Sequence, residues 1–334
     1  SAAQQATLIP RKENAGDMVT SSNPANTKSE EHLVSVLLPA FREPIEHFSM
    51  SLKSILNQTY RRIEVLVILD DPNNEAIASF VRAQTRIDNR IQLIVNKTNL
   101  GLARSLNNAI KIARGAFLCR MDADDIADSD RIQYQLNYLK RNNLDLVGGY
   151  LRTISEQGIF MYNVENIPCK PTSIRKALRW NNCVPHPTWL GRRNVFEIGY
   201  RSIALCEDYD FLLRSALRGK RIGNVPKIVI SYRMGSSSIS RSNLYDQFLS
   251  QQFLTKCYAQ GTTADPGLLE QWVQTKSSEK KRRRYTEANA CFNTALQQFS
   301  NGHILSAAIN GFRTVLLSRQ YVCKVARLAI ASTK

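Results

Sequence analysis

The stretch Phe117-Leu118-Cys119-Arg120-Met121-Asp122-Ala123-Asp124-Asp125 decides the fold of this chain and tells most about its chemistry. An apolar run ends there in three carboxylates, two of them in Asp-x-Asp spacing. If the run is a strand, residues two apart project to the same side, so Asp122 and Asp124 face one ligand together. Mg²⁺ prefers oxygen ligands and takes one or two carboxylates together with substrate phosphates. The alternative is a solvated acidic turn that caps the next helix.

The residues around this stretch alternate between strand and helix patterns. Apolar runs of strand length cover residues 33–38, 63–69, 91–95 and 116–121. Apolar residues at helical spacing cover residues 46–58, 75–87 and 102–113 between them, and a helix capped by Asp128 or Ser129 would run to Arg141. Strands that alternate with helices of this length predict right-handed βαβ units and an α/β fold with a mainly parallel, Rossmann-like sheet.

The rest of the chain is less regular and then becomes helical. Short strand patterns are expected at 145–148, 151–155, 188–190, 222–225 and 228–233, and a helix at 207–217. From Ser242 onward every pattern is helical, with helices starting at Pro266 and in the basic cluster 280–284. We therefore expect a flexible polar arm at 1–31, an α/β domain at 32–241 and a helical basic region at 242–334.

Charge and cysteine usage narrow the partners and the compartment. The 334 residues carry a formal net charge of +17, and residues 276–334 alone hold eleven basic and two acidic side chains. Such an excess predicts an anionic partner, either nucleic acid or a phospholipid surface. Seven scattered cysteines without a Cys-x-x-Cys pair suit a reducing compartment rather than a disulfide framework or a zinc site. With no run resembling a signal peptide or a membrane span, we expect a cytosolic or peripheral membrane protein.

Four loops with polar side chains follow the four predicted strands. They cover residues 39–43, 70–75, 99–104 and 122–125. In a parallel sheet these loops lie at one edge, where ligands bind. Each loop also has an ordinary structural explanation as a strand breaker, turn or helix cap. The chain has no Gly-x-Gly-x-x-Gly and no Gly-Lys-Ser/Thr, which disfavours dinucleotide enzymes and P-loop NTPases.

Taken in order, these motifs resemble family 2 glycosyltransferases of the GT-A fold, most nearly the bacterial exopolysaccharide and O-antigen type. The resemblance covers roughly residues 33–234. It rests on Val36-Leu37-Leu38-Pro39-Ala40-Phe41, Val67-Ile68-Leu69-Asp70-Asp71, Asn99-Leu100-Gly101, Met121-Asp122-Ala123-Asp124-Asp125, His186-Pro187-Thr188 and Glu207-Asp208-Tyr209-Asp210-Phe211. The ordered set is much more specific than any one motif.

The resemblance implies a binding site for a nucleotide sugar at the first two strand ends. Pro39, Phe41 and Glu43 would border the nucleobase and ribose pocket. Either Asp70 or Asp71 would accept a hydrogen bond from the base. In relatives this loop often reads Asp-Asp-Gly-Ser, and Pro72 stiffens it here.

The resemblance also implies a metal site that involves the diphosphate. Arg104 would lie near the diphosphate, Asp122 would approach the ribose directly or through the metal, and Asp124 would hold Mg²⁺ or Mn²⁺. Asp125 would support the start of the next helix. Many relatives have a histidine after the Tyr-Arg that ends the catalytic domain, but no histidine follows Arg233 here. The Asp-x-Asp motif would then be the main protein contact of the metal.

On the acceptor side, the resemblance assigns the catalytic base to Asp208 of the Glu207-Asp208 pair. A base on the face of the sugar away from the leaving group is what an inverting transfer needs. Because the pair starts a predicted helix, we expect the helix dipole to lower the pKa of Asp208. Glu207 and His186 are further acceptor-side candidates. The alternatives are a helix cap for the pair and a purely structural role for a histidine between two prolines.

These roles describe an inverting, metal-dependent transferase that moves a sugar from a UDP-hexose or UDP-N-acetylhexosamine to a lipid-linked or oligosaccharide acceptor in bacterial surface polysaccharide synthesis. We expect it in the cytoplasm, peripheral on the inner face of the cell membrane.

Aromatic residues are not interleaved with the basic run, which disfavours nucleic acid and leaves an anionic membrane surface as partner of the C-terminal helices. The apolar stripe of those helices could instead pack on the catalytic domain or in an oligomer. Two other classes stay open: a nucleotidyltransferase on a similar sheet, and a non-catalytic nucleotide-sugar-binding or scaffold protein.

Overall fold

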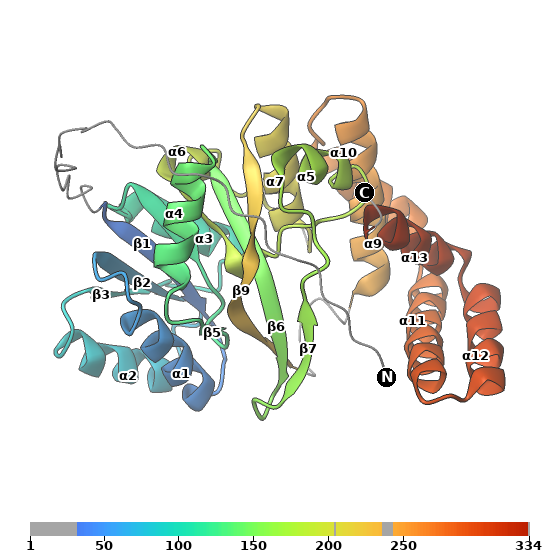
Figure 1. The fold of residues 1–334 in the computed structure, drawn as a ribbon, viewed down its shortest axis with the longest axis horizontal. Coiled ribbons are helices and arrows are strands. Elements are labelled where there is room, and N and C mark those ends of the chain that lie inside the picture. The colour runs from blue at the N-terminus through green and yellow to red at the C-terminus, as the bar shows by residue number, and fades with distance from the viewer. Residues whose placement is uncertain (1–31, 204, 236–242, 333–334) are drawn as a thin grey trace, which may run out of the picture. The chain divides into compact units, whose positions relative to one another are not determined.

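Four parallel strands form the half of the sheet in which the first predicted site residues lie (Figure 1). The computed structural model describes residues 32–203, 205–235 and 243–332. The strands are β1 (Val34–Ala40), β2 (Ile63–Leu69), β3 (Ile91–Val95) and β4 (Phe117–Arg120). Strand β1 pairs in parallel with β2 and β4, and β2 pairs in parallel with β3. The arm predicted for residues 1–31 and the boundary predicted after residue 241 lie outside the described residues.

Every residue of β1 and β2 is buried because helices cover both faces of the sheet. Helices α1 (Ile45–Leu56) and α2 (Glu75–Thr85) pack on the face that carries Val36, and α3 (Leu102–Ile112) packs on the face that carries Leu37. A strand buried on both faces has a continuous apolar sequence instead of an alternating one. This is why the strands are readable as uninterrupted apolar runs.

The other half of the sheet is mixed rather than parallel. Its strands are β5 (Ile126–Ala127), β6 (Leu146–Ser155), β7 (Phe160–Val164), β8 (Leu190–Arg192) and β9 (Ile222–Met234). Within the described residues, the strand order is β3-β2-β1-β4-β8-β6-β9-β5, and β7 pairs with the edge of β6. Strand β8 is antiparallel to β4 and β6, whereas β6 and β9 are parallel. The long strands β6 and β9 bring the second half of the chain beside β4.

Several local predictions for this half are wrong. The strand patterns at 145–148 and 151–155 are one strand, β6, which continues through Gly148 and Gly149. A Cβ atom on Gly148 would lie 2.4 Å from Asn224 Oδ1, so the close approach of β9 requires glycine there. The patterns at 222–225 and 228–233 are likewise one strand, β9, which shifts its register on both sides of Tyr150. Residues 186–188 form a short 3-10 helix that contains Pro187, and the strand expected at 188–190 is β8, which starts only at Leu190.

The helices of this half largely follow the predicted pattern. They are α4 (Arg131–Arg141), α5 (Pro171–Ala177), α6 (Arg193–Phe196) and α7 (Glu207–Leu217). Helix α4 starts at Arg131 with Asp130 as its N-cap, not Asp128 or Ser129, whose backbone carbonyl oxygens accept hydrogen bonds from Gln58 and Thr59. Strands β5 and β7 are too short or too exposed to give an apolar pattern, and neither is predicted.

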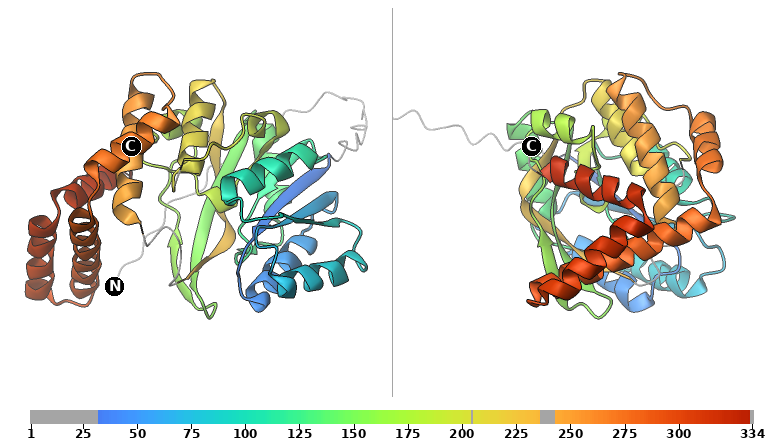
Figure 2. Two further views of the ribbon diagram at one scale, coloured as in Figure 1. Left: turned by 180° about the vertical axis from the view of Figure 1, so that it is seen from behind. Right: turned by 90° about the vertical axis from the view of Figure 1, so that its right-hand side faces the viewer.

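The C-terminal region is helical, as expected. Its helices are α9 (Leu244–Ala259), α10 (Pro266–Lys276), α11 (Glu279–Ser300), α12 (Ile304–Leu317) and α13 (Arg319–Ser332). Helix α9 joins them to the α/β part, because Gln247 Nε2 donates a hydrogen bond to the carbonyl oxygen of Leu205, 3.1 Å away, just before α7. Figures 1 and 2 show α11 and α12 as an antiparallel pair on the side of the protein away from β1–β3. In the described residues no helix is both long enough and apolar enough to cross a membrane.

Candidate active site

The first two strand ends meet as predicted. The pairing of Ala40 with Leu69 places the loop after β1 beside the loop after β2. Asp71 Oδ2 lies 2.9 Å from Arg42 Nε, and Asn74 Nδ2 donates a hydrogen bond to the carbonyl oxygen of Phe41 over 2.8 Å. These contacts fix the two loops to each other and leave Pro39, Phe41 and Glu43 along their shared edge.

The two aspartates after β2 have different environments. The carboxylate of Asp70 is buried and accepts hydrogen bonds from Asn96 Nδ2 and from the backbone N–H groups of Leu100 and Gly101, each over 2.8 Å. It therefore holds the loop that leads to α3. The carboxylate of Asp71 faces Arg42 on the surface side. Arg104, in the first turn of α3, has an exposed side chain.

Four carboxylates cluster where β1 and β4 end, namely those of Glu43, Asp122, Asp124 and Asp125. Burial raises the pKa of Asp124 to about 7, and the negative charges of Asp122 and Glu43 add to this effect. Burial also raises the pKa values of Glu43 and Asp125, and nearby carboxylates contribute in both cases. Asp125 does not support a helix start, because its Oδ1 accepts the backbone N–H of Arg233 over 2.9 Å and β5 follows it.

The donor set of this cluster fits a divalent cation. Four carboxylates crowded in a poorly solvated place repel one another, and a bound cation would relieve that repulsion. In the described parts of the chain, no three His, Cys, Asp or Glu side chains are placed to form a metal site by themselves. Mg²⁺ commonly takes only one or two carboxylates from the protein, and Asp122 and Asp124 can supply these.

A buried arginine, not predicted from the sequence, supports the cluster. Arg120 at the end of β4 is 2% exposed and its Nη2 contacts Asp122 Oδ1. Its Nε and Nη1 have no hydrogen-bond partner among the residues that the structure describes. The sequence does contain a signal for this residue, since a charged side chain in an otherwise apolar strand must be paired or functional.

A cavity of about 480 Å³ connects the two predicted centres. It brings together Asp122 from the end of β4, Asp208 from the start of α7, and His186 from the 3-10 helix. These three lie far apart in the sequence and meet because β8, β6 and β9 fold back against β4. The remaining wall residues are Arg120, Leu151, Val164, Ile167, Asn181, Asn182, Cys183, Pro185, Pro187 and Tyr232.

Asp208 is a half-buried carboxylate at the cavity wall, and its pKa is raised, which contradicts the expectation of a lowered pKa. Burial is the main cause and outweighs the stabilisation by the start of helix α7. Asp208 Oδ2 accepts a hydrogen bond from Asn182 Nδ2 over 2.8 Å, and Oδ1 accepts the backbone N–H of Tyr209 over 2.7 Å. Burial and the charge of Asp208 also raise the pKa of Glu207, to about 7. A carboxylate with a raised pKa is a stronger base than an exposed one.

His186 is fixed by aromatic neighbours in the wall of the cavity. Its Nε2 lies 2.9 Å from the Tyr200 hydroxyl oxygen, and its ring packs edge-on against Trp189 at 4.5 Å between centroids. Burial lowers the pKa of His186 well below its usual value. His186 is therefore a neutral, rigidly held residue at the cavity surface.

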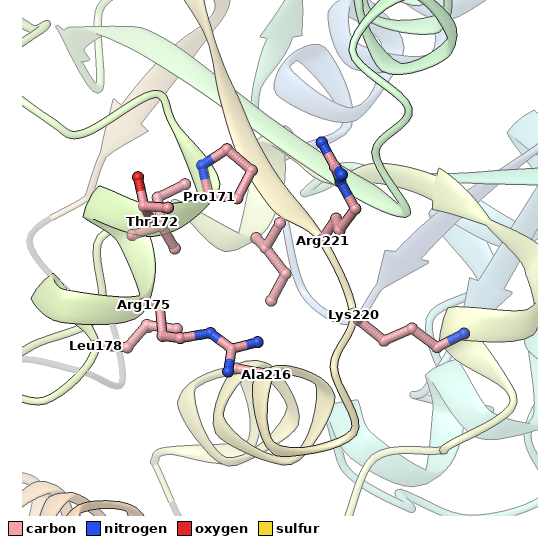
Figure 3. A pocket seen from close by; sticks show the side chains of 9 residues that line it. Pro171, Thr172, Arg175, Leu178, Ala216, Lys220 and Arg221 are labelled. Atoms are coloured by element: carbon pink, nitrogen blue, oxygen red, sulfur yellow. The ribbon is translucent and has the colours of Figure 1, made fainter.

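A separate cavity of about 310 Å³ contains none of the predicted residues (Figure 3). It lies between α5, the end of α7 and the start of β9, and Arg175, Lys220 and Arg221 surround it. Ile222 lines this cavity, whereas Tyr232 on the same strand lines the first one. The two cavities are therefore separated along β9.

The motifs at this site match a known family of enzymes. Residues 35–199 match the family model described as glycosyl transferase family 2. The O-antigen biosynthesis glycosyltransferase WbnJ of Escherichia coli is 30% identical over 216 residues, which cover 64% of this chain and 84% of WbnJ. The chain belongs to glycosyltransferase family 2. This membership confirms the predicted resemblance and favours a glycosyltransferase over the nucleotidyltransferase and scaffold alternatives.

Further relatives and solved structures agree with this family 2 fold. The UDP-Glc:alpha-D-GlcNAc-diphosphoundecaprenol beta-1,3-glucosyltransferase WfgD of Escherichia coli is 29% identical over 226 residues, covering 66% of this chain and 85% of WfgD. TarS 1–349 of S. aureus, solved with UDP-GlcNAc, has a TM-score of 0.55 at 15% identity over 90% of both chains. The mannosyltransferase PcManGT of Pyrobaculum calidifontis, solved with GDP-Man and Mn²⁺, has a TM-score of 0.54 at 17% identity, covering 91% of this chain and 87% of that one. The glycosyltransferase thus has the predicted GT-A architecture, extended by C-terminal helices.

Proposed function

We propose that this glycosyltransferase is inverting and metal-dependent, and that it transfers a sugar from a UDP-hexose or UDP-N-acetylhexosamine to a lipid-linked saccharide. The observation that carries the proposal is that Asp122 and Asp208 line one cavity. The first belongs to a carboxylate cluster that suits a cation and a diphosphate, and the second is a carboxylate whose raised pKa suits it to take a proton. Residues 32–241 would form the catalytic domain and 242–334 the basic helical region.

On the donor side, the joined loops after β1 and β2 would hold the nucleoside. Pro39, Phe41 and Glu43 would border the base and ribose. We assign the base contact to Asp71, because the carboxylate of Asp70 already accepts three hydrogen bonds that hold the loop before α3. The exposed guanidinium of Arg104 would pair with the diphosphate.

Asp122 and Asp124 would hold Mg²⁺ or Mn²⁺ against the diphosphate. The bound cation would supply Lewis-acid neutralisation of the negative charge that grows on the leaving nucleoside diphosphate. Arg120 contacts Asp122 from the buried side of the cluster, so it would fix the orientation of that carboxylate. A cation in a relative's solved structure supports a divalent metal in this fold.

On the acceptor side, Asp208 would remove the proton from the acceptor hydroxyl as the new glycosidic bond forms. The proton moves to a carboxylate oxygen of Asp208, and the electron pair of the broken bond leaves with the diphosphate. Asn182 and the N–H of Tyr209 hold the carboxylate in place. Glu207 and the neutral His186 would line the acceptor path. Attack from the side of Asp208, opposite the diphosphate, inverts the anomeric carbon.

A lipid-linked acceptor suits the apolar side of the cavity. Leu151, Val164 and Ile167 form part of its wall. Beyond Val164, the edge strand β7 exposes Phe160 and Met161. The names of WbnJ and WfgD, which refer to O-antigen synthesis and to a diphosphoundecaprenol acceptor, also support this substrate class. The setting implied is the cytoplasmic face of the bacterial cell membrane.

The Phe160→Ser/Met161→Ser variant should raise KM for a diphosphoundecaprenol-linked saccharide about tenfold, since two apolar contacts worth about 1 kcal/mol or less each are lost. The KM for the nucleotide sugar should stay unchanged. Initial rates with each substrate varied in turn measure both values. Equal KM values for the lipid-linked acceptor in both proteins would exclude β7 from the acceptor path.

A screen of nucleotide sugars tests the function as a whole. The protein is incubated with UDP-, GDP- and dTDP-sugars, with Mn²⁺ or with EDTA, and release of the nucleoside diphosphate is followed. We expect one UDP-sugar to be hydrolysed slowly with Mn²⁺ and not with EDTA, and the product linkage to be inverted once an acceptor is added. Turnover that is unaffected by EDTA, or a retained anomeric configuration, would contradict the proposal.

A further inference from the structure

Helix α12 exposes its large apolar side chains and buries its small and polar ones. Six apolar residues on one side of the helix are between 54% and 77% exposed, and we call them the α12 apolar face: Ile304, Leu305, Ile309, Phe312, Val315 and Leu316. The opposite side, with the buried residues Ala307 and Thr314, packs against α11. An ordinary amphipathic helix of a water-soluble domain has the reverse arrangement.

The contact between α11 and α12 does not depend on these large side chains. Ala295 is buried on α11, and Asn310 Nδ2 donates a hydrogen bond to Gln298 Oε1 over 2.9 Å. Small residues and interhelical hydrogen bonds are how helices associate when their outer surfaces are in a lipid environment. The α12 apolar face is therefore available for a hydrophobic surface outside the described protein.

The charge around this face favours an anionic bilayer over a second copy of the chain. Residues 276–334 carry eleven basic and two acidic side chains, and Arg313 is the one charged residue of α12. Arg284 donates hydrogen bonds to the carbonyl oxygens of Leu316 and Leu317, which places a cation at the C-terminal end of the apolar face. Pairing two copies through α12 would bring two strongly basic segments together, whereas anionic headgroups would neutralise them.

We propose that α12 lies in the surface of an anionic membrane, with the α12 apolar face among the lipid chains and the flanking basic residues at the headgroups. The inference rests on the proposed function in one respect: membrane binding would bring the active site to a lipid-linked acceptor. Helix α13 ties the pair to α9, because Tyr321 Oη donates to Asn289 Oδ1 on α11 and Arg327 Nη2 to Thr255 Oγ1 on α9. Helix α9 in turn contacts the residues before α7, which carries Asp208.

Vesicle binding tests this surface without any sugar donor or acceptor. The full chain is sedimented with vesicles of phosphatidylglycerol and phosphatidylcholine, or of phosphatidylcholine alone. We expect binding to the anionic vesicles, and a loss of at least about tenfold in the Ile309→Asp/Phe312→Asp variant, because charged side chains do not enter the acyl region. Ile87→Asp is the matched control, since Ile87 is 80% exposed in the turn between α2 and β3 and should bind like the unaltered protein.

Two further measurements separate the outcomes. Tryptophan placed at position 312 (Phe312→Trp) should shift its emission to the blue on anionic vesicles. Sedimentation velocity of the unaltered chain gives its oligomeric state. If Ile309→Asp/Phe312→Asp binds vesicles as well as Ile87→Asp does, or if the unaltered protein is a dimer that this variant dissociates, the membrane surface is wrong. A failed nucleotide-sugar screen would leave vesicle binding unaffected, so the two proposals fail separately.

Discussion

Replacing Asp208 with asparagine should lower kcat for transfer about a thousandfold and leave KM for the donor nearly unchanged, because general base catalysis contributes roughly 10²- to 10⁴-fold. Asparagine has the same shape and can still accept the N–H of Tyr209, but it cannot take a proton. The melting temperature of the Asp208→Asn variant should not fall. Burial raises the pKa of Asp208, so the folded state disfavours the ionised carboxylate and a neutral amide removes that cost.

A matched variant on the same helix separates chemistry from folding. Asp210 is buried two residues further along α7, where its carboxylate pairs with Arg201 and with Arg214, whose Nε is 2.7 Å from Asp210 Oδ2. Asp210→Asn should lower the melting temperature, because it leaves the buried guanidinium of Arg214 and the half-buried one of Arg201 with less compensation. The kcat of its folded fraction should stay within a fewfold. A rate for Asp208→Asn above about a tenth of the unaltered value would remove Asp208 as the base.

The pH profile of kcat gives the same assignment a second test. Asp208 acts only when ionised, and its pKa is raised, so activity should fall with decreasing pH earlier than for an exposed aspartate. The hydrogen bond from Asn182 favours the ionised form. Asn182→Ala should therefore move the acidic limb of the profile to higher pH. If the acidic limb of the kcat profile lies at the same pH in both proteins, a group other than Asp208 controls it.

The parallel half of the fold was predictable because its signals are local. The runs at 63–69 and 91–95 are β2 and β3 to the residue, since strands covered on both faces are apolar throughout. Strand β2 also pairs in parallel with β1, so the loops that follow these two strands lie side by side. This is why the Asp70-Asp71 loop could be predicted to lie beside Pro39 and Phe41. Which of two adjacent aspartates points inward depends on the loop that it meets, and that contact is not local.

The other half depends on contacts between distant residues. Asp208 meets Asp122 only because β6 and β9 run beside each other for their full length, and no local pattern fixes that pairing. The pKa of Asp208 was predicted in the wrong direction for the same reason. The helix dipole is a local property, whereas the burial that raises the pKa of Asp208 depends on segments distant in the sequence, and the charge of Arg120 acts against it by lowering the pKa.

Replacing Asp124 with asparagine should reduce transfer by about a thousandfold or more and raise the Mn²⁺ concentration needed for half-maximal activity. The amide keeps the size of the side chain but removes a charge that opposes the cation, and the leaving diphosphate would then be poorly neutralised. Asp130→Asn is the matched control. Asp130 is half-buried, pairs with Lys227 and lies outside the carboxylate cluster, so this variant should keep the Mn²⁺ response of the unaltered protein.

The pH dependence of the metal requirement distinguishes this role from a purely structural one. Burial and the charges of Asp122 and Glu43 raise the pKa of Asp124 to about 7, so protons compete with the cation below that pH. The Mn²⁺ concentration for half-maximal rate should therefore increase as the pH is lowered from about 8 to 6. In Asp124→Asn this increase should be smaller, because the proton that competes has been removed with the carboxylate. If the variant responds to Mn²⁺ and to pH as the unaltered enzyme does, Asp124 is not a metal ligand, and the cluster serves only to shape the end of β4.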